Sequence, residues 1–326
     1  MRFCVLGARF PPLSGALFFL FVLAACAGPP NRVLSDGQPP LPSSVELSDT
    51  PFFTQSDYQC GPAALATVLA ASGSRVDPEA LVDQVYLPAR RGSLQVEMLA
   101  TARRYGSIAI EIEPVLPALL QTVAEGYPVI VLQNLGLSWL PRWHYAVIIG
   151  YSLDSRSIVL RSGTARRLEL PIATFERSWS GSGRWAMTAF RPGTLPSTVP
   201  ERDYLQAAMA FERSAAAGAA LPAYDAAVQR WPGNRMAWLG LGNNAYGLAD
   251  WPRAENAFMQ AAALPGDPAP ALNNLALTLA SQGRLQEAIV AAERAVAAGG
   301  QFEPTARATL AQLRQSSQDS IGGSPR

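Results

Sequence analysis

The sequence contains no lysine, a single histidine and three cysteines among its 326 residues. All 26 basic residues are therefore arginines, and they nearly balance the 25 acidic residues. This balance leaves no basic field for nucleic acid and no polybasic patch for anionic lipid. Because cysteine and histidine are so scarce, a zinc site built from these residues is excluded, and we expect no cofactor. Any chemistry that needs an imidazole must use His144.

The overall composition excludes a disordered chain. Hydrophobic residues make up 49% of the sequence and charged residues 16%, which is too apolar for intrinsic disorder. The length corresponds to about two domains.

The first 25 residues have the pattern of a secretion signal. Arg2 and Arg9 give a positive start, and an apolar run over residues 13–25 is too short to favour a membrane-spanning helix. The run ends in Leu-Ala-Ala-Cys at residues 23–26, which resembles a bacterial lipobox, in which the cysteine (here Cys26) becomes the lipidated first residue. An ordinary signal peptide that happens to contain a cysteine is the alternative.

The predicted lipid anchor implies a compartment. Ala27 follows the lipidated Cys26 and is not the aspartate that typically retains such lipoproteins at the inner membrane. We therefore expect the periplasm, at the outer membrane, with membrane contact only through the lipid. Cleavage would remove Cys4, so Cys60 would remain as the only free thiol, and no intrachain disulfide could form.

Changes in composition divide the chain into segments. Proline and serine are frequent in two linkers, mixed helix and strand patterns lie between them, and an alanine-rich helical region follows. The predicted segments are a signal peptide (1–25), a tether (26–50), a mixed domain (51–191), a linker (192–200), a helical region (201–316) and a disordered tail (317–326).

The alanine-rich region repeats with a spacing of 34 residues. Small residues recur at Ala208, Gly242 and Ala276. A second position of the repeat is aromatic in the first two units, at Tyr224 and Phe258, and is Ala292 in the third. This pattern resembles the tetratricopeptide repeat, in which small residues allow close helix packing and aromatic residues fill the gaps. We predict three repeats (201–234, 235–268, 269–302) and a capping helix over 303–315, and a generic alanine-rich bundle is the alternative.

Solenoids of this kind bind peptides or proteins on the concave face. In the predicted register, that face would carry four polar or charged residues, which are Arg202, Asn243, Tyr246 and Asn273. We expect a protein partner there, and solvated groove residues without a ligand are the alternative.

Two sequence segments in the mixed domain suggest chemistry. Cys60 is followed by Gly-Pro and an apolar helical pattern to Ala71, so it should lie at a helix N-terminus, where the helix dipole lowers the pKa of a thiol. His144 precedes a buried strand over residues 145–149 and should lie at the end of that strand. A cysteine on a helix that meets a histidine on a strand is the arrangement of a Cys–His nucleophile pair.

The two segments together resemble a known family. Cys-Gly-Pro-Ala-Ala-Leu from Cys60, an upstream glutamine and the later His-Tyr-Ala-Val-Ile-Ile-Gly-Tyr from His144 are similar to papain-like cysteine peptidases that trim double-glycine leaders from bacteriocins. The resemblance is closer to bacterial lipoproteins that join such a domain to tetratricopeptide repeats. It implies an α+β papain-like domain followed by an all-α solenoid.

The resemblance also implies roles for residues. Cys60 would be the nucleophile, His144 its general base, and Gln55 the side chain that binds the oxyanion, with Gln59 as a second choice. The family usually has an aspartate on the strand after the histidine strand, but the residue here is Ser162. Ser162 or a backbone carbonyl could orient the imidazole instead.

Two further residues are candidates for the third position. Asp154 is the nearest acid after His144, but it should lie at a hairpin tip about 30 Å along the strand. Asn134, after the preceding strand, is a weaker candidate.

The sequence therefore predicts a lipid-anchored periplasmic cysteine peptidase that acts on a peptide or protein substrate. A peptidase-like scaffold that binds without cutting is the alternative, and transfer to an amine would use the same residues. The double-glycine specificity belongs to transporter-linked relatives, and this chain has no transporter segment, so we do not extend it to this chain.

Overall fold

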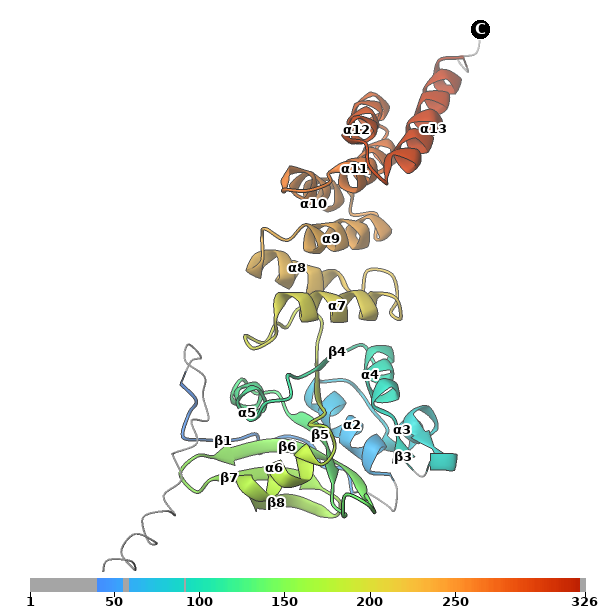
Figure 1. Cartoon of the computed structure of the whole chain (residues 1–326). Coiled ribbons are helices and arrows are strands. Elements are labelled where there is room, and N and C mark those ends of the chain that lie inside the picture. The colour runs from blue at the N-terminus through green and yellow to red at the C-terminus, as the bar shows by residue number, and fades with distance from the viewer. Residues whose placement is uncertain (1–39, 55–58, 91, 323–326) are drawn as a thin grey trace, which may run out of the picture. The chain divides into compact units, whose positions relative to one another are not determined.

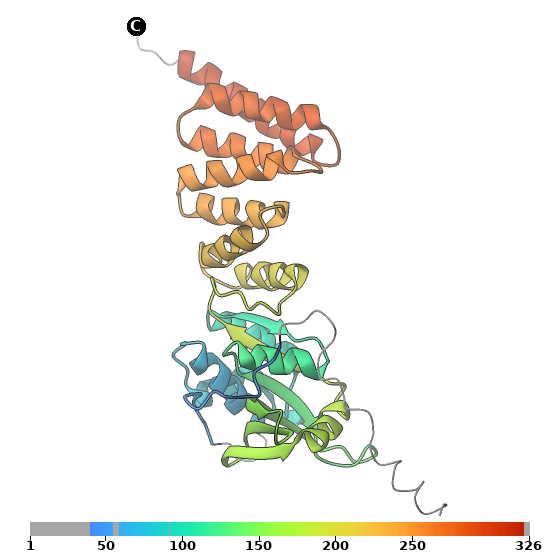
Figure 2. The same cartoon turned by 90° about the vertical axis from the view of Figure 1, so that its left-hand side faces the viewer.

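The computed structural model describes residues 40–54, 59–90 and 92–322, and its elements are labelled in Figure 1. Gln55 and the leader, including Cys26, lie outside the described residues. Figures 1 and 2 show strands and short helices up to about residue 190 and helices alone after it. The chain is therefore an α+β domain followed by an all-α repeat solenoid, as the sequence predicts.

The α+β domain is built on one antiparallel sheet. Six strands follow the order β4-β9-β5-β6-β7-β8, and β1 pairs with the end of β6. The strands of this sheet are β1 (Ser44–Glu46), β4 (Ile108–Glu111), β5 (Val129–Asn134), β6 (Trp143–Ser152), β7 (Ser157–Ser162), β8 (Ala165–Pro171) and β9 (Ala186–Phe190). A separate small hairpin is formed by β2 (Tyr86–Leu87) and β3 (Gly92–Ser93).

The last residues of the predicted tether include a strand in the structure. β1 lies inside the predicted 26–50 segment and pairs Val45 with Tyr151. β5 accompanies β6 only as far as Ile148, so the last residues of β6 have a free edge on that side, which β1 occupies.

Helices cover both faces of the sheet. The described helices are α2 (Cys60–Ala71), α3 (Pro78–Val85), α4 (Gln95–Arg104), α5 (Leu116–Ala124) and α6 (Ile172–Ser180). Leu65 and Leu69 of α2 are fully buried in one cluster with Tyr145 and Val147 of β6. Because side chains alternate along a strand, these two β6 residues share the face that α2 covers. α2 contacts β5, β6 and β9, while α5 and α6 contact strands β5 to β8.

The solenoid consists of antiparallel helix pairs. The described helices are α7 (Glu201–Glu212), α8 (Leu221–Arg230), α9 (Arg235–Gly247), α10 (Trp251–Ala263), α11 (Ala269–Ser281), α12 (Leu285–Ala298) and α13 (Glu303–Gly322). The first helices of the three predicted repeats begin at residues 201, 235 and 269, which reproduces the 34-residue period. Figure 2 shows the helices stacked in chain order, from yellow to red.

Small and aromatic residues make the close approaches that the repeat pattern predicts. A methyl group added at Gly242 would lie 2.5 Å from the ring of Phe258, so only glycine leaves room for this ring. A methyl group added at Gly240 would lie 2.2 Å from the ring of Tyr224 in the same way.

The end of the chain is more helical than expected. α13 continues to Gly322, although the sequence predicts a disordered tail from residue 317. Residues 323–326 lie outside the described residues. Among the residues that the structure describes, no helix is long and apolar enough to cross a membrane.

Candidate active site

Cys60 is the first residue of α2. The helix begins there because Ala63 N–H donates to the Gln59 carbonyl, which closes the first turn. Pro62 lies third in the helix, where a missing N–H costs nothing because the first four amides have no helical partner. Cys60 is partly buried against the core beneath α2, and its thiol is not in a disulfide.

The Cys60 sulfur lies beside β6. The backbone N–H groups of Tyr145, Gly61 and Cys60 itself hydrogen-bond the sulfur and lower its pKa. Burial raises the pKa by more, so the pKa of the Cys60 thiol lies above its usual range. This differs from the sequence-based expectation of a lowered pKa, because desolvation of the thiolate outweighs the amides at the helix end.

His144 lies at the start of β6, as the sequence predicts, and pairs in register with Gln133 of β5. Its Nε2 is 2.8 Å from the hydroxyl oxygen of Ser162 on β7. In the sheet register Val147 faces Arg161, so Ser162 lies diagonally across from His144 on the same face. Ser162 is therefore the group that contacts the imidazole where the family has an aspartate.

The environment of His144 favours the neutral imidazole. Burial lowers the pKa of His144, and the positive charge of Arg142 lowers it further. The lowered pKa of His144 favours the neutral imidazole, and the raised pKa of Cys60 favours the protonated thiol. Ser162 carries no charge that would oppose this.

The cysteine and the histidine approach the same stretch of backbone. Tyr145, whose N–H contacts the Cys60 sulfur, directly follows His144. Within the described residues, no hydrogen bond joins Cys60 Sγ to the His144 ring. Nε2 is the ring nitrogen that contacts Ser162, and Nδ1 is the other ring nitrogen.

The other candidate residues that the sequence suggests for this site are Asp154, Asn134, Gln59 and Gln55. Asp154 is exposed in the turn between β6 and β7, at the far end of both strands from His144. The Asn134 side chain accepts hydrogen bonds from the backbone N–H groups of Gly136 and Arg142, both at 2.9 Å, so it shapes the loop before β6. Gln59 is half-buried at the N-cap position of α2, where its side chain makes no capping hydrogen bond, and Gln55 falls on residues that the structure does not describe.

The model of the Peptidase_C39 like family matches residues 47–187 of the chain. These residues form a peptidase C39-like domain. Among solved structures, the chain is similar to a candidate C39-like peptidase from Bacillus anthracis, with 20% identity and a TM-score of 0.39. That match covers 46% of this chain and 98% of the other. Among curated proteins, none matches the chain.

The C39-like domain also contains site residues that sequence reasoning missed. A methyl group at Gly61 would lie 2.2 Å from the Ser93 hydroxyl oxygen, so β3 packs directly on the first turn of α2. The Tyr145 hydroxyl donates to the Ser93 carbonyl at 3.0 Å. Ser93, the last residue of β3, thereby links β6 to the helix that carries Cys60. Only the small size of Gly61 and Ser93 could have suggested this contact.

The four solenoid residues predicted to line a groove differ in exposure. Arg202 is exposed and paired with Asp203, and the exposed Asn243 accepts from the Asn274 amide at 3.0 Å. Tyr246 is half-buried against Trp251. Asn273 is only 3% exposed, so a ligand could reach it only if the helices moved.

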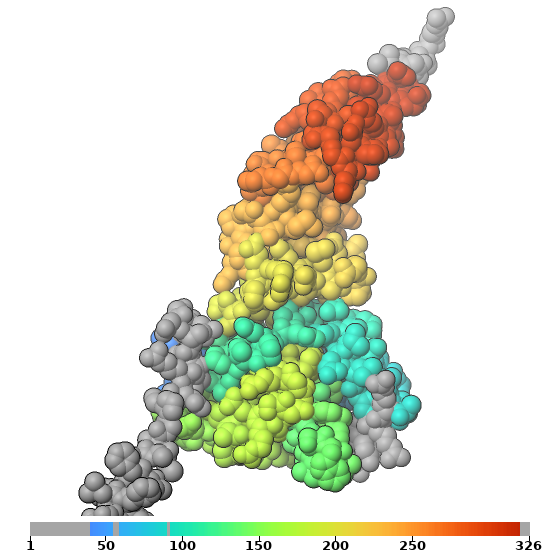
Figure 3. Space-filling view, viewed as in Figure 1, coloured from blue at the N-terminus to red at the C-terminus, as the bar shows by residue number. Residues whose placement is uncertain are grey.

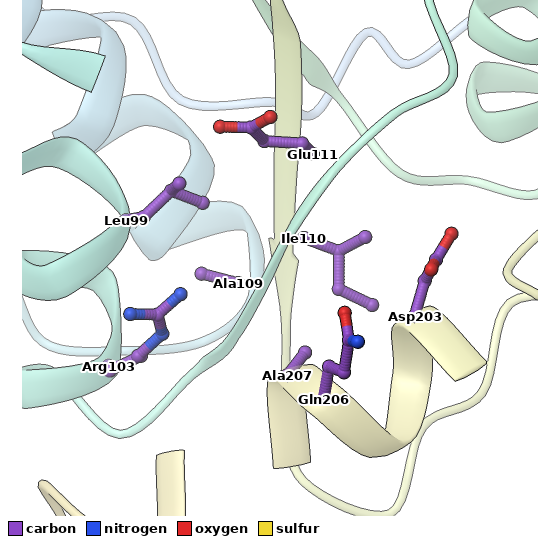
Figure 4. A pocket seen from close by; sticks show the side chains of 8 residues that line it. All are labelled: Leu99, Arg103, Ala109, Ile110, Glu111, Asp203, Gln206 and Ala207. Carbon is purple, nitrogen blue, oxygen red and sulfur yellow. The ribbon is translucent and has the colours of Figure 1, made fainter. Parts of the chain in front are cut away.

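A pocket lies away from the candidate catalytic residues. It has a volume of about 350 Å³ and is formed by α4, β4 and α7. Figure 4 shows its lining residues, which are Leu99, Arg103, Ala109, Ile110, Glu111, Asp203, Gln206 and Ala207. Cys60, His144 and Ser162 are absent from this lining. No cluster of three or more metal-ligating side chains occurs in the described part of the chain.

Proposed function

We propose that the chain is a lipid-anchored periplasmic cysteine peptidase that hydrolyses peptide bonds through Cys60 and His144. One observation carries this proposal. His144 contacts Ser162 through Nε2 at 2.8 Å, while the next residue, Tyr145, contacts the sulfur of the helix-borne Cys60. The match of residues 47–187 to a peptidase family supports the same reaction class.

The first step that we propose begins from neutral groups. The Nε2–H of His144 donates to Ser162, which leaves Nδ1 unprotonated and able to accept the proton from the Cys60 thiol. As that proton moves, the sulfur attacks the peptide carbonyl, and a carbon–sulfur bond forms while the carbonyl oxygen becomes an oxyanion. The imidazolium then gives its proton to the leaving amine as the carbon–nitrogen bond breaks.

Water completes the cycle. His144 takes a proton from the water that attacks the thioester, and it returns this proton to the sulfur when the carboxylic acid leaves. We assign stabilisation of the oxyanion to the Cys60 backbone N–H and the Gln55 side chain. Loss of one such donor typically slows catalysis about a hundredfold or more.

The remaining parts of the proposal concern location and partners. Lipidation at Cys26 would hold the domain at the periplasmic face of the outer membrane. The solenoid, whose helix pairs have the 34-residue period of tetratricopeptide repeats, would recruit a protein substrate or hold the enzyme in an assembly.

A binding scaffold without activity is the second candidate. Three observations favour it. Ser162 is neutral where the family has an acid, the pKa of Cys60 is raised, and no hydrogen bond joins the sulfur to the imidazole among the described residues. In this case the domain would hold a peptide without cleaving it. Transfer of the acyl group to an amine would use the same residues as hydrolysis.

Cleavage of a random peptide library, followed by mass spectrometry, tests the proposal. We expect wild type to cut peptides, and Cys60→Ser and His144→Ala to lose this activity. Ser180→Ala, an exposed hydroxyl change at the end of α6, is the control and should cut as wild type does. Undiminished cleavage by Cys60→Ser would overturn the proposal. Peptide binding without any cleavage by wild type would establish the scaffold instead.

A further inference from the structure

The loop between β5 and β6 is a hairpin with an exposed apolar tip. We call residues 135–142 the β5–β6 hairpin. At its tip, Leu137 is 57% exposed, Trp139 76% and Leu140 60%. Two more large apolar residues at its base, Leu135 and Trp143, are more than half exposed. In Figure 3 the green segment of the chain forms a protruding lobe at the lower edge of the C39-like domain.

Part of the backbone of this hairpin is hydrogen-bonded internally. Leu137 and Leu140 exchange two hydrogen bonds of 3.1 Å, and Leu135 N–H donates to the Arg142 carbonyl at 2.9 Å. Asn134 binds two further amides through its side chain. Backbone groups that already have partners can enter a water-poor environment without the penalty of unpaired polar atoms. The apolar tip is therefore held in a defined, ordered projection.

The charges of the hairpin are of one sign. Between Asn134 and Trp143 there is no acidic residue, and Arg142 is the one charged side chain. Tryptophan and arginine at the base of an apolar tip are the residues that favour the boundary between lipid headgroups and acyl chains. The hairpin thus combines an apolar end with a positive base.

We propose that the β5–β6 hairpin inserts its tip into the surface of a phospholipid bilayer that contains anionic lipid. Leu137, Trp139 and Leu140 would enter the headgroup region, and Arg142 would contact lipid phosphates. This inference goes beyond the proposed peptidase function and does not require it. It also adds a second membrane contact to the one that the sequence predicts through the lipid anchor alone.

Lengths along the chain allow both contacts on one membrane. The chain between Cys26 and Pro40 can extend to at most about 50 Å. β1, which follows it, begins at Ser44, which pairs with Ser152, about 31 Å along β6 from Trp143. An anchor at Cys26 can therefore reach the membrane that the hairpin touches.

A peptide substrate is the competing occupant of the tip. Leu140 lies four residues before His144, which is about 13 Å along an extended chain, so the tip and the imidazole are separated along the hairpin. The three most exposed side chains also project from the turn end of the hairpin, not from its base beside His144. These two features favour a bilayer surface over a peptide.

Vesicle sedimentation tests the proposal with the chain from residue 27 on, which keeps every described residue and lacks the lipid. We expect binding to vesicles of phosphatidylethanolamine with one-quarter phosphatidylglycerol. The combined changes Leu137→Ser, Trp139→Ser and Leu140→Ser should lower this binding about tenfold or more. Arg142→Gln should lower it about fivefold and should have no effect on neutral phosphatidylcholine vesicles.

The solenoid provides a matched control. Met236, Met259 and Val290 are 51%, 53% and 56% exposed, so Met236→Ser, Met259→Ser and Val290→Ser together remove a similar number of exposed apolar groups. This control variant should bind vesicles as wild type does. Equal loss in both triple variants, or no loss in the tip variant, would overturn the proposal. A tip variant that binds vesicles normally but has a raised KM for peptides would assign the hairpin to substrate instead.

A second measurement does not depend on disrupting the tip. Phospholipids with brominated acyl chains should quench part of the tryptophan fluorescence of wild type. Trp139→Phe keeps an aromatic side chain at the tip, so it should still bind vesicles but lose much of this quenching. Quenching equal to that of wild type would overturn insertion at Trp139. Cys60→Ala should bind and quench as wild type does, which separates a failure of this proposal from a failure of the peptidase proposal.

Discussion

The Nε2 atom of His144 lies 2.8 Å from the hydroxyl oxygen of Ser162 on the neighbouring strand. A hydroxyl at this position can fix the orientation and the tautomer of the ring, as an acid would. It cannot stabilise the imidazolium by charge. The site therefore retains a positioning residue for the histidine but lacks the electrostatic support that a carboxylate would supply.

The pKa of His144 should report this loss of charge directly. Because His144 is the only histidine, its ring protons give a single NMR titration. We expect a pKa below the usual value for histidine, since burial and Arg142 both disfavour the imidazolium. Arg142→Gln should raise the pKa, and Ser162→Asp should raise it further by placing a carboxylate beside Nε2.

In the proposed mechanism, the same lowered pKa of His144 sets the acidic limb of the activity. A general base must be unprotonated, so a lowered pKa keeps His144 competent at a lower pH than an ordinary histidine. The acidic limb of kcat/KM should therefore lie below pH 6.5 in wild type and move upward in Ser162→Asp. Arg307→Gln, an exposed change in α13, is the control and should leave both titrations unaltered. A wild-type pKa above the usual value would contradict the buried, neutral imidazole.

Alkylation of Cys60 should be slow at neutral pH. Burial raises the pKa of this thiol, so only a small fraction is thiolate at pH 7. In the chain from residue 27 on, Cys60 is the only cysteine, so the rate of reaction with iodoacetamide reports this thiol alone. The rate should rise only at alkaline pH and should change little in His144→Ala.

The opposite profile would identify a different resting state. Fast alkylation that persists to pH 6 and is lost in His144→Ala would require a preformed thiolate–imidazolium pair. The neutral starting state of the proposed mechanism would then be wrong, although the nucleophile and base would remain the same. Denatured protein is the control, because unfolding should restore the ordinary pH profile of a free thiol.

The elements that carry the site were predictable because their sequence patterns are local. The strand at His144, the helix after Cys60 and the 34-residue spacing of the solenoid each depend on neighbours along the chain. The position of Ser162 was also predictable, since it lies one strand after His144 and the alternation of the strand fixes its face.

Features that depend on contacts between distant segments were not predictable. The raised pKa of Cys60 results from the burial of this first residue of α2 beside β6. No pattern among neighbouring residues in the sequence indicates this burial. The pairing of β1 with Tyr151 depends on where β5 stops pairing with β6. The exposure of the apolar side chains at the hairpin tip depends on which of them pack against other segments. The roles of Ser93 and Arg142 beside the site likewise appear only in three dimensions.

Gly61 should be intolerant of substitution because Ser93 occupies the space of its missing side chain. A methyl group there would lie 2.2 Å from the Ser93 hydroxyl oxygen and 2.5 Å from its Cβ. Gly61→Ala should therefore lower the free energy of unfolding by about 1–3 kcal/mol, measured by urea denaturation. It should also lower activity, because the clash lies next to Cys60.

Two variants distinguish this clash from a general effect of alanine. Ser93→Gly removes both clashing atoms and should restore much of the stability of Gly61→Ala. Gly247→Ala, at the end of α9, has no atom within 4 Å of the added methyl group, so it should be neutral or slightly stabilising. If Ser93→Gly gave no rescue, steric contact between α2 and β3 would not explain the loss.

Arg161 should contribute more to stability than its neighbour Arg167. Arg161 is 5% exposed, and one of its terminal nitrogens donates to the carbonyls of Ser48 at 3.0 Å and Thr50 at 2.9 Å, while another donates to Arg166. Arg161→Met keeps an apolar stem but leaves these buried carbonyls without donors, which should cost about 2–4 kcal/mol in urea denaturation. Arg167→Ala is the matched control on β8, because it removes only solvent-exposed ion pairs, with Glu46 and Glu169, and should change stability little. Because Arg161 connects residues 48–50 to β7 next to Ser162, Arg161→Met should also reduce activity. Equal stability of Arg161→Met and Arg167→Ala would show that the hydrogen bonds of Arg161 contribute nothing to stability.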